Sequence, residues 1–293
     1  MKIVFFGTPK FAVPTLLKLV EHHEVIAVVT QPDKKKNRGQ KLLFSDVKEE
    51  ALKLGIEVLQ PERLREASIP EADAYVVVAY GQIFPERLLC APRYGCLNVH
   101  ASLLPNYRGA APIQRAIEDG AKESGVCIMR MEKGLDTGDV ILKQSVEIGD
   151  KDSVQLSEEL SHLGARMMVD ALDLIASGKA QYEKQGPDFT YAGMIGKKDY
   201  EMDFSKSYRQ NLQKIRAFGY IKTSIDEKST KVYAISPVDE KTAECPEQDR
   251  DRVIVRKEGI FVRLADGWVE ITELQPENSK RMPAKAYLLG RRK

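Results

Sequence analysis

A chain of 293 residues with 43% apolar and 30% charged side chains has enough apolar surface for a full core, which excludes a largely disordered protein. A formal net charge of only +2 also excludes a polycation that coats nucleic acid over its whole surface. The N-terminal apolar run, residues 3–6, ends at Gly7 and is too short for a signal peptide or a membrane span. We therefore expect a cytoplasmic protein without a membrane segment.

The N-terminal part of the chain alternates short apolar runs with amphipathic segments. The runs that we expect to be strands are residues 3–6, 25–30, 57–59, 74–79 and 96–100. The segments with helical periodicity are residues 11–20, 46–54, 113–118 and 157–176. Residues 125–131 and 140–148 have the pattern of a hairpin. Strands that alternate with helices imply parallel crossovers, so we expect an α/β fold with a doubly wound parallel sheet.

The character of the sequence changes after Gly178. A polar connecting segment is followed by a predicted helix over residues 208–217. The strand-like pieces after it are residues 220–225, 231–235, 252–257, 260–263 and 268–274. Short strands separated by turns predict a small antiparallel barrel. We therefore expect one domain over residues 1–189, a linker over 190–204 and a second domain over 205–293.

Charge is distributed unevenly between the two parts. Residues 1–189 carry 24 Lys+Arg against 27 Asp+Glu, a net charge of −3. Residues 190–293 carry 21 against 16, a net charge of +5. A basic C-terminal third suits a polyanionic partner, although an ordinary solvated surface fits the charge equally well.

Two common kinds of site are missing from the sequence patterns. The first turn after a strand, Gly7-Thr8-Pro9, lacks the second and third glycines of a dinucleotide-binding G-x-G-x-x-G motif. The four cysteines form no C-x-x-C pair and have no histidine at a metal-ligand spacing. We therefore expect reduced thiols and no metal.

The segment Leu97-Asn98-Val99-His100 holds the first candidate site. Residues two apart in a strand share a face, so Asn98 and His100 project together at the end of a predicted parallel strand, where ligands bind in open α/β sheets. An amide beside an imidazole offers two donors to a developing oxyanion. The alternative is that backbone groups satisfy both side chains.

Two further segments are candidates. The loop Gly134-Leu135-Asp136-Thr137-Gly138-Asp139 can hold the Asp136 carboxylate in an unusual pose, and near His100 it would favour the protonated imidazole. An ordinary turn between strands is the alternative. Residues 31–42 carry five basic residues and one acidic one, which would suit phosphates of an RNA end. A solvated loop is the alternative there.

Together these segments resemble the methionyl-tRNA formyltransferase family. The resemblance rests on residues 6–9, 31–33, 78–81, 98–105, 108–114 and 134–139. It is strong over the N-terminal two thirds of the chain and weak over the rest. The Asn-His pair, the Ser-Leu-Leu-Pro run and the later aspartate are common to folate-dependent formyltransferases. The RGAAPIQ run and the QPD loop are more specific to enzymes that act on tRNA.

The resemblance implies a Rossmann-like N-terminal catalytic domain and a C-terminal barrel that resembles an OB-fold. It implies that the chain, as a monomer, transfers the formyl group of 10-formyltetrahydrofolate to the α-amino group of methionyl-initiator tRNA for translation initiation. The residues that match the catalytic triad are Asn98, His100 and Asp136. Those that match the folate-contacting segment are Ser102, Leu103, Leu104 and Pro105. Those of the basic loop that match the tRNA-contacting insertion are Lys35, Arg38 and Lys41.

Two other functions fit parts of this pattern. A formyltransferase that acts on an amino sugar-nucleotide or another small amine would use the same triad, but it has no need of a basic loop and a basic C-terminal third. A non-catalytic RNA-binding protein with the same fold has no need of all three triad residues. The sequence therefore favours the tRNA formyltransferase.

Overall fold

The computed structural model describes residues 1–35, 42–238 and 252–290, and the chain forms two compact units. The first, here called the N-terminal unit, comprises Met1–Pro112, Glu123–Glu147 and Val154–Ala192. The second, here called the C-terminal unit, comprises Ile113–Lys122, Ile148–Ser153 and Gly193–Lys293. In the described part of the chain, no helix combines the length and apolar character needed to cross a membrane.

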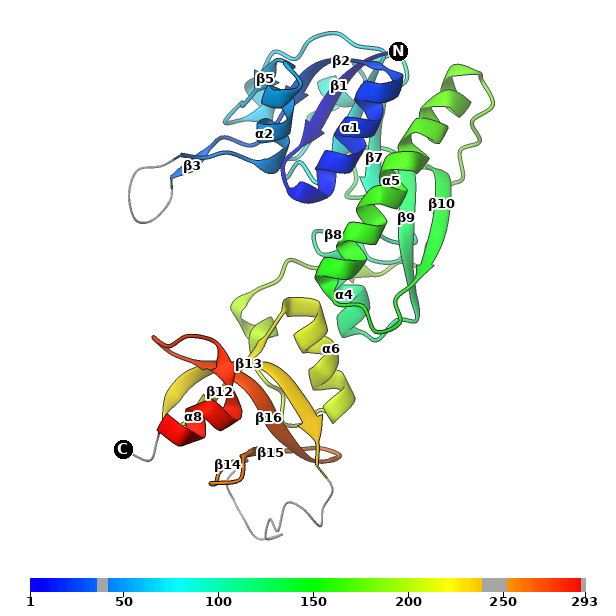
Figure 1. Ribbon diagram of the computed structural model, residues 1–293. Helices are drawn as coiled ribbons and strands as arrows, with labels where there is room; N and C mark the ends of the chain where they lie inside the picture. The colour runs from blue at the N-terminus through cyan, green and yellow to red at the C-terminus, as the bar shows by residue number, and fades with distance from the viewer. Residues whose placement is uncertain (36–41, 239–251, 291–293) are drawn as a thin grey trace. The chain divides into compact units, whose positions relative to one another are not determined.

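A seven-stranded sheet forms the centre of the N-terminal unit (Figure 1), in the order β10-β9-β7-β6-β1-β2-β5. Its strands are β1 (Lys2–Gly7), β2 (Glu24–Val29), β5 (Val58–Leu59), β6 (Ala74–Val78), β7 (Cys96–His100), β9 (Glu123–Arg130) and β10 (Val140–Glu147). The five strands from β7 to β5 are parallel, and β9 and β10 continue the sheet as an antiparallel hairpin. The predicted doubly wound sheet and its hairpin are confirmed.

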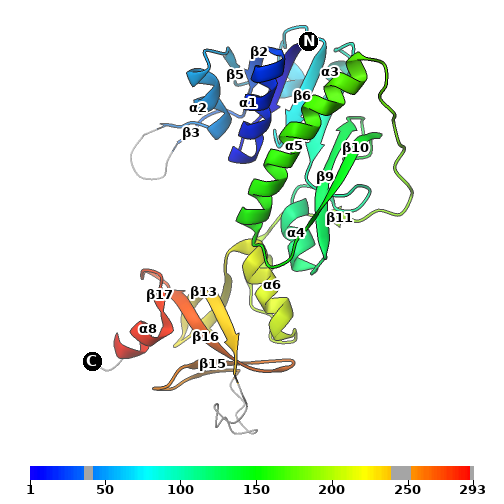
Figure 2. The ribbon, with the colours of Figure 1, turned by 45° about the vertical axis from the view of Figure 1, so that its right-hand side comes forward.

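The longest helix, α5 (Ser153–Ala176), lies along one face of the sheet in both views (Figures 1 and 2). Gly164 permits the close approach, because a Cβ at this position would lie 2.5 Å from Cγ1 of Val99 on β7. Val99 therefore faces α5, and the alternation of a strand directs Asn98 and His100 away from that helix. This face of β7 is the one that carries the candidate site.

The remaining elements of the N-terminal unit are short. Its other helices are α1 (Val13–His22), α2 (Asp46–Lys53) and α3 (Glu86–Leu89), with 3-10 turns η1 (Lys10–Ala12) and η2 (Leu64–Glu66). Its two small strand pairs are β3 (Lys34–Lys35) with β4 (Leu42–Leu43), and β8 (Arg108–Gly109) with β11 (Tyr191–Ala192). On the sheet face opposite α5, the rings of Phe6, Tyr80 and Phe84 pack edge to face in a buried cluster.

A curled antiparallel sheet forms the C-terminal unit, in the order β12-β13-β16-β15-β14 with β17 paired to β16. Its strands are β12 (Ile221–Ile225), β13 (Lys228–Pro237), β14 (Val253–Val255), β15 (Ile260–Leu264), β16 (Gly267–Pro276) and β17 (Met282–Pro283). The edge strands β12 and β14 come close to each other but are not hydrogen-bonded, so the sheet is a half-barrel around an aliphatic core. The predicted small antiparallel barrel is confirmed in this form.

Helices complete the C-terminal unit. Those in the described part of this unit are α4 (Pro112–Glu118), α6 (Tyr208–Phe218) and α8 (Ala284–Gly290), with the 3-10 turn η3 (Lys197–Tyr200). Arg115 on α4 pairs with Glu118 and with Asp199 of η3, at 2.6 and 2.9 Å. The Arg115 guanidinium holds the pKa of Asp199 below its ordinary value. Arg216 on α6 donates to the carbonyls of Gly149 and Lys151, which lie in the segment Ile148–Ser153 of this unit.

Candidate active site

His100 is buried at the end of β7, with both ring nitrogens directed at oxygen atoms. Its Nε2 lies 3.0 Å from the carbonyl oxygen of Tyr107, and its Nδ1 lies 3.7 Å from Oδ2 of Asp136. A carbonyl only accepts, so Nε2 carries a hydrogen. The second distance is that of an ion pair, longer than a direct hydrogen bond. Only a protonated imidazole presents N–H groups to both partners.

Asp136 lies in the loop between β9 and β10, in a pose that its neighbours impose. The backbone there has φ +52°, a left-handed conformation that aspartate tolerates better than most residues. The backbone N–H of Gly109 donates to Oδ2 at 2.8 Å. Gly138 is required nearby, because a Cβ there would lie 1.7 Å from the carbonyl oxygen of Arg130. The loop thus brings a carboxylate of restricted geometry to the imidazole.

Asn98 is half-buried and lies two residues before His100 on the same strand. It pairs in register with Val77 on β6 and Met129 on β9, so its position is set by strands on both sides. The structure therefore brings His100 and Asp136 together and places Asn98 two residues before His100 on the same face of β7. The two ring nitrogens of His100 face Tyr107 and Asp136, so neither is paired with the Asn98 amide.

The residues of the predicted folate-contacting segment differ in exposure. Ser102 is buried and donates to the carbonyl of Asn106 at 2.7 Å. Leu104 is buried in a small cluster with Cys127, Met129 and Val140. Leu103 and Pro105 are half-exposed, and the peptide bond between Leu104 and Pro105 is cis. Of these four residues, only Leu103 and Pro105 therefore have accessible apolar surface.

The base of the basic loop is anchored to α2 and to the residue that follows β5. Asp33 accepts from Lys48 at 2.6 Å and from Gln60 at 2.8 Å. The hydrogen bond from Lys48 holds the pKa of Asp33 below its ordinary value. Lys35 follows in β3, whereas Arg38 and Lys41 lie outside the described residues. The anchor fixes where the loop leaves the sheet.

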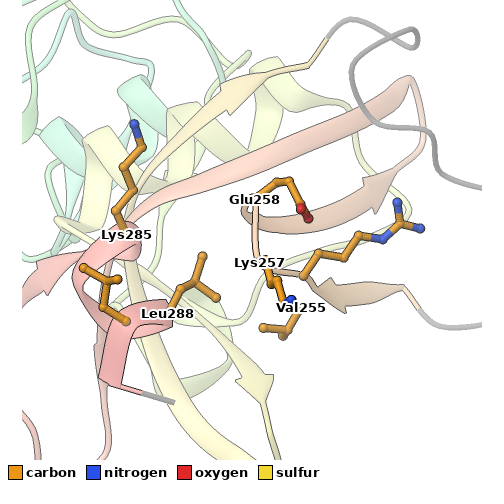
Figure 3. A pocket seen from close by; sticks show the side chains of 7 residues that line it. Val255, Lys257, Glu258, Lys285 and Leu288 are labelled. Atoms are coloured by element: carbon orange, nitrogen blue, oxygen red, sulfur yellow. The ribbon is translucent and has the colours of Figure 1, made fainter. Parts of the chain in front are cut away.

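The C-terminal unit contains a basic cavity of about 540 Å³. Figure 3 shows that it lies between α8 and the turn after β14. Its charged lining consists of Arg256, Lys257, Lys285 and Glu258. Three cations against one carboxylate favour an anionic ligand. No sequence pattern pointed to this cavity, because its residues come from a turn and a helix far apart in the chain.

Metal chemistry has no candidate side-chain cluster in the ranges that the structure covers: no group of three or more His, Cys, Asp or Glu there could hold an ion. The hydrogen bonds from Gln185 to the carbonyls of Asp136 and Gly138 were not predicted from the sequence. Gln185 lies in a polar stretch without periodicity, and no signal in that stretch marks it.

Comparison with known proteins identifies the family of this chain. Residues 1–172 match the family described as formyl transferase, and residues 194–292 match the formyl transferase C-terminal domain. A methionyl-tRNA formyltransferase of Caldanaerobacter subterraneus subsp. tengcongensis is 42% identical over 99% of this chain and 97% of its own. The corresponding protein of Geobacter metallireducens is 44% identical over 99% of this chain and 96% of its own.

Solved structures with lower identity show the same fold. The sugar 3N-formyl transferase WlaRD is 19% identical, with a TM-score of 0.65 over 96% of this chain and 99% of its own. HypX from Aquifex aeolicus, in complex with tetrahydrofolic acid, is 17% identical, with a TM-score of 0.64 over 99% of this chain. This chain spans about half the length of HypX, 47%. With matches over both of its parts, and with relatives above 40% identity along nearly its whole length, the chain belongs to the formyl transferase family and resembles its methionyl-tRNA formyltransferases in particular.

Proposed function

We propose that this chain is an enzyme that transfers the formyl group of 10-formyltetrahydrofolate to the α-amino group of methionyl-initiator tRNA. The observation that supports the proposal most directly is the approach of Asp136 to His100 at the carboxyl end of β7, with Asn98 on the same face of that strand, in a chain of the formyl transferase family. The two relatives with 42% and 44% identity are named methionyl-tRNA formyltransferase, and the match covers nearly their full length. We also propose that it acts in the cytoplasm as a monomer.

The chemistry assigns one role to each of the three side chains. The acceptor amine attacks the formyl carbon, a new C–N bond forms, and the carbonyl oxygen becomes an oxyanion. The amide of Asn98 donates to that oxygen, and so does the Nδ1–H of His100, which makes no direct hydrogen bond to Asp136 at 3.7 Å. Preorganised donors of this kind are each worth about 10²- to 10³-fold in rate. The Asp136 carboxylate, 3.7 Å from Nδ1, stabilises the positive charge on the imidazole.

Proton balance completes the reaction. The attacking amine acquires positive charge and must lose a proton, and the folate nitrogen must gain one as its bond to the formyl carbon breaks. Asp136 can take part in this transfer, directly or through water, because the Gly109 N–H bonds only to its Oδ2, which leaves Oδ1 to accept a proton. Neither step needs a covalent bond to the enzyme.

Binding of the two substrates uses other parts of the chain. We assign the folate to the segment of Ser102, Leu103, Leu104 and Pro105, where Leu103 and Pro105 supply accessible apolar surface and the two buried residues fix the backbone. We assign phosphates of the tRNA to Lys35, Arg38 and Lys41 of the basic loop. The cations around the cavity of the C-terminal unit are candidates for further phosphate contacts.

The rival acceptor is an amino sugar-nucleotide, because WlaRD, which has the same fold, is a sugar 3N-formyl transferase. Its identity of 19% lies far below the 42% and 44% of the tRNA enzymes. The deciding experiment incubates the chain and 10-formyltetrahydrofolate with charged initiator tRNA, and separately with a thymidine-diphosphate amino sugar. Mass spectrometry of both acceptors identifies the product. Formylmethionyl-tRNA supports the proposal, and formylation of the sugar alone overturns it.

A further inference from the structure

Gln185 connects a buried arginine to the loop that carries Asp136. Its amide oxygen accepts from Nε and Nη2 of Arg108, at 2.9 and 2.7 Å. Its amide nitrogen donates to the carbonyl oxygens of Asp136 and Gly138, both at 2.8 Å. A primary amide has two N–H groups, and both are used. Gln185 is half-buried, whereas its neighbours from residue 181 to residue 191 are exposed.

The orientation of this amide follows from Arg108. A guanidinium only donates, so the oxygen of Gln185 must face it and the nitrogen must face the two carbonyls. The Arg108 side chain is itself fixed, because it is buried and lies over the ring of Phe189 at 4.6 Å. The contact between Gln185 and the Asp136 loop therefore has a single polarity.

The same segment also holds the other loop of the site. The hydroxyl of Thr190 accepts from the backbone N–H of Tyr107 at 2.8 Å, and its carbonyl accepts from that of Arg108 at 2.9 Å. Tyr107 supplies the carbonyl oxygen that faces His100. Upstream, Glu183 and Val140 exchange two backbone hydrogen bonds. Residues 183–192 are thus hydrogen-bonded both to Tyr107, which faces Nε2 of His100, and to Asp136, which faces Nδ1.

Asp136 needs such support because of its backbone. A non-glycine residue at φ +52° persists where surrounding contacts over-determine it. The Gly109 N–H holds the carboxylate, and Gln185 holds the carbonyl of the same residue. Side chain and backbone are therefore both fixed relative to Arg108 and Gly109, which are adjacent in sequence.

We propose that Gln185 is a positioning residue, which holds the Asp136 loop so that the carboxylate faces His100. The inference rests on the proposed function, since it assigns Gln185 an effect on the same reaction. The hydrogen bonds of Gln185 reach the backbone of the Asp136 loop and the Arg108 guanidinium, so its effect on His100 would pass through Asp136. The purely structural alternative is that Gln185 only stabilises the fold.

Two variants separate these possibilities. Gln185→Ala removes both halves of the connection. Gln185→Glu keeps an acceptor for Arg108, so the buried guanidinium stays paired and the variant should fold. Its second carboxylate oxygen faces the carbonyls of Asp136 and Gly138, to which it has no hydrogen to donate. Gln144→Ala, an exposed glutamine on β10 of the same unit, is the matched control. Thermal unfolding establishes that each variant is folded before its kinetics are compared.

The measurements are kcat, the KM for each substrate, the pH profile of kcat, and hydrogen exchange of the Gly109 amide. Displacement of a reacting group by about 1 Å can cost about 100-fold in rate, so we expect kcat to fall by about 10- to 100-fold in both variants. We expect little change in either KM. The pH profile of Gln185→Ala should shift in the same direction as that of Asp136→Asn, and Gly109 should exchange faster.

A double-mutant cycle gives the sharpest contrast. If Gln185 acts through Asp136, adding Gln185→Glu to Asp136→Asn lowers single-turnover rates little further. Independent losses that multiply in the double variant would overturn the inference, as would wild-type kcat with unchanged Gly109 exchange in folded Gln185→Glu. Formylation of charged tRNA by the wild type is measured first, so failure of the proposed function is recognised separately.

Discussion

Replacing Asp136 with asparagine tests the electrostatic part of the site. Asparagine retains an oxygen that accepts from the Gly109 N–H, so the loop should keep its conformation while the charge is lost. Two unit charges 3.7 Å apart attract by about 4.5 kcal/mol at an effective dielectric constant of about 20, and by about 1 kcal/mol in bulk water. Both side chains are mostly buried, at 6% and 16% exposure, which favours the upper part of this range.

The corresponding loss in kcat lies between about 5-fold and about 2,000-fold, because about 1.4 kcal/mol is a factor of ten. Steady-state and single-turnover formylation over a range of pH measure it. Asp139→Asn is the matched control, since it neutralises another carboxylate of the same loop. Turnover within twofold of wild type and an unshifted pH profile in folded Asp136→Asn would refute the reasoning, and would leave Asp136 as a turn residue.

Three further predictions concern the donors, the basic loop and the C-terminal unit. His100→Ala should lower kcat by about 10²- to 10³-fold with folate affinity little changed, and a folded variant with normal turnover would contradict this. Replacing Lys35 and Arg38 with alanine should raise the KM for tRNA. It should also reduce the slope of log affinity for tRNA against log salt concentration by about 0.9 per lost contact to duplex phosphate. If wild type and variant gave parallel lines of equal intercept, the loop would have no role in tRNA binding. Asp199→Asn should destabilise the C-terminal unit by about 1–3 kcal/mol at neutral pH, because it weakens charged hydrogen bonds from Arg115. Since Arg115 lowers the folded-state pKa of Asp199, this contribution is present above the ordinary pKa of 3.8 and is lost as pH falls through the folded pKa, so unfolding curves that differ equally at neutral and strongly acidic pH would exclude it.

Local patterns were sufficient for the sheet and for the shared strand face of Asn98 and His100, whose catalytic roles the family resemblance implied and which stay a prediction. The run of residues 96–100 predicts a strand, and the strand β7 has the same bounds. Its period of two places Asn98 and His100 on one face, and Val99 against α5 confirms that alternation. Strand periodicity reports on neighbours along one segment, and this is the information that a single sequence carries most directly.

Contacts between distant loops were beyond local patterns. The two glycines of the loop at residues 134–139 suggested a constrained carboxylate, but its approach to His100 depends on how the hairpin of β9 and β10 joins β7. Gln185 is 49 residues from Asp136 and lies in a stretch without periodicity, so only the folded chain reveals their contact. Helix α8 was not predicted either.

The central claim is that the acceptor is the amine of a charged tRNA, and its most direct test compares two acceptors on one enzyme. The measurement is kcat/KM for methionyl-initiator tRNA and for a thymidine-diphosphate amino sugar, with 10-formyltetrahydrofolate as donor and the same enzyme preparation. The account predicts efficient formylation of the tRNA, with a kcat/KM that falls as salt rises, and a far lower value for the sugar. A higher kcat/KM for the amino sugar would contradict it.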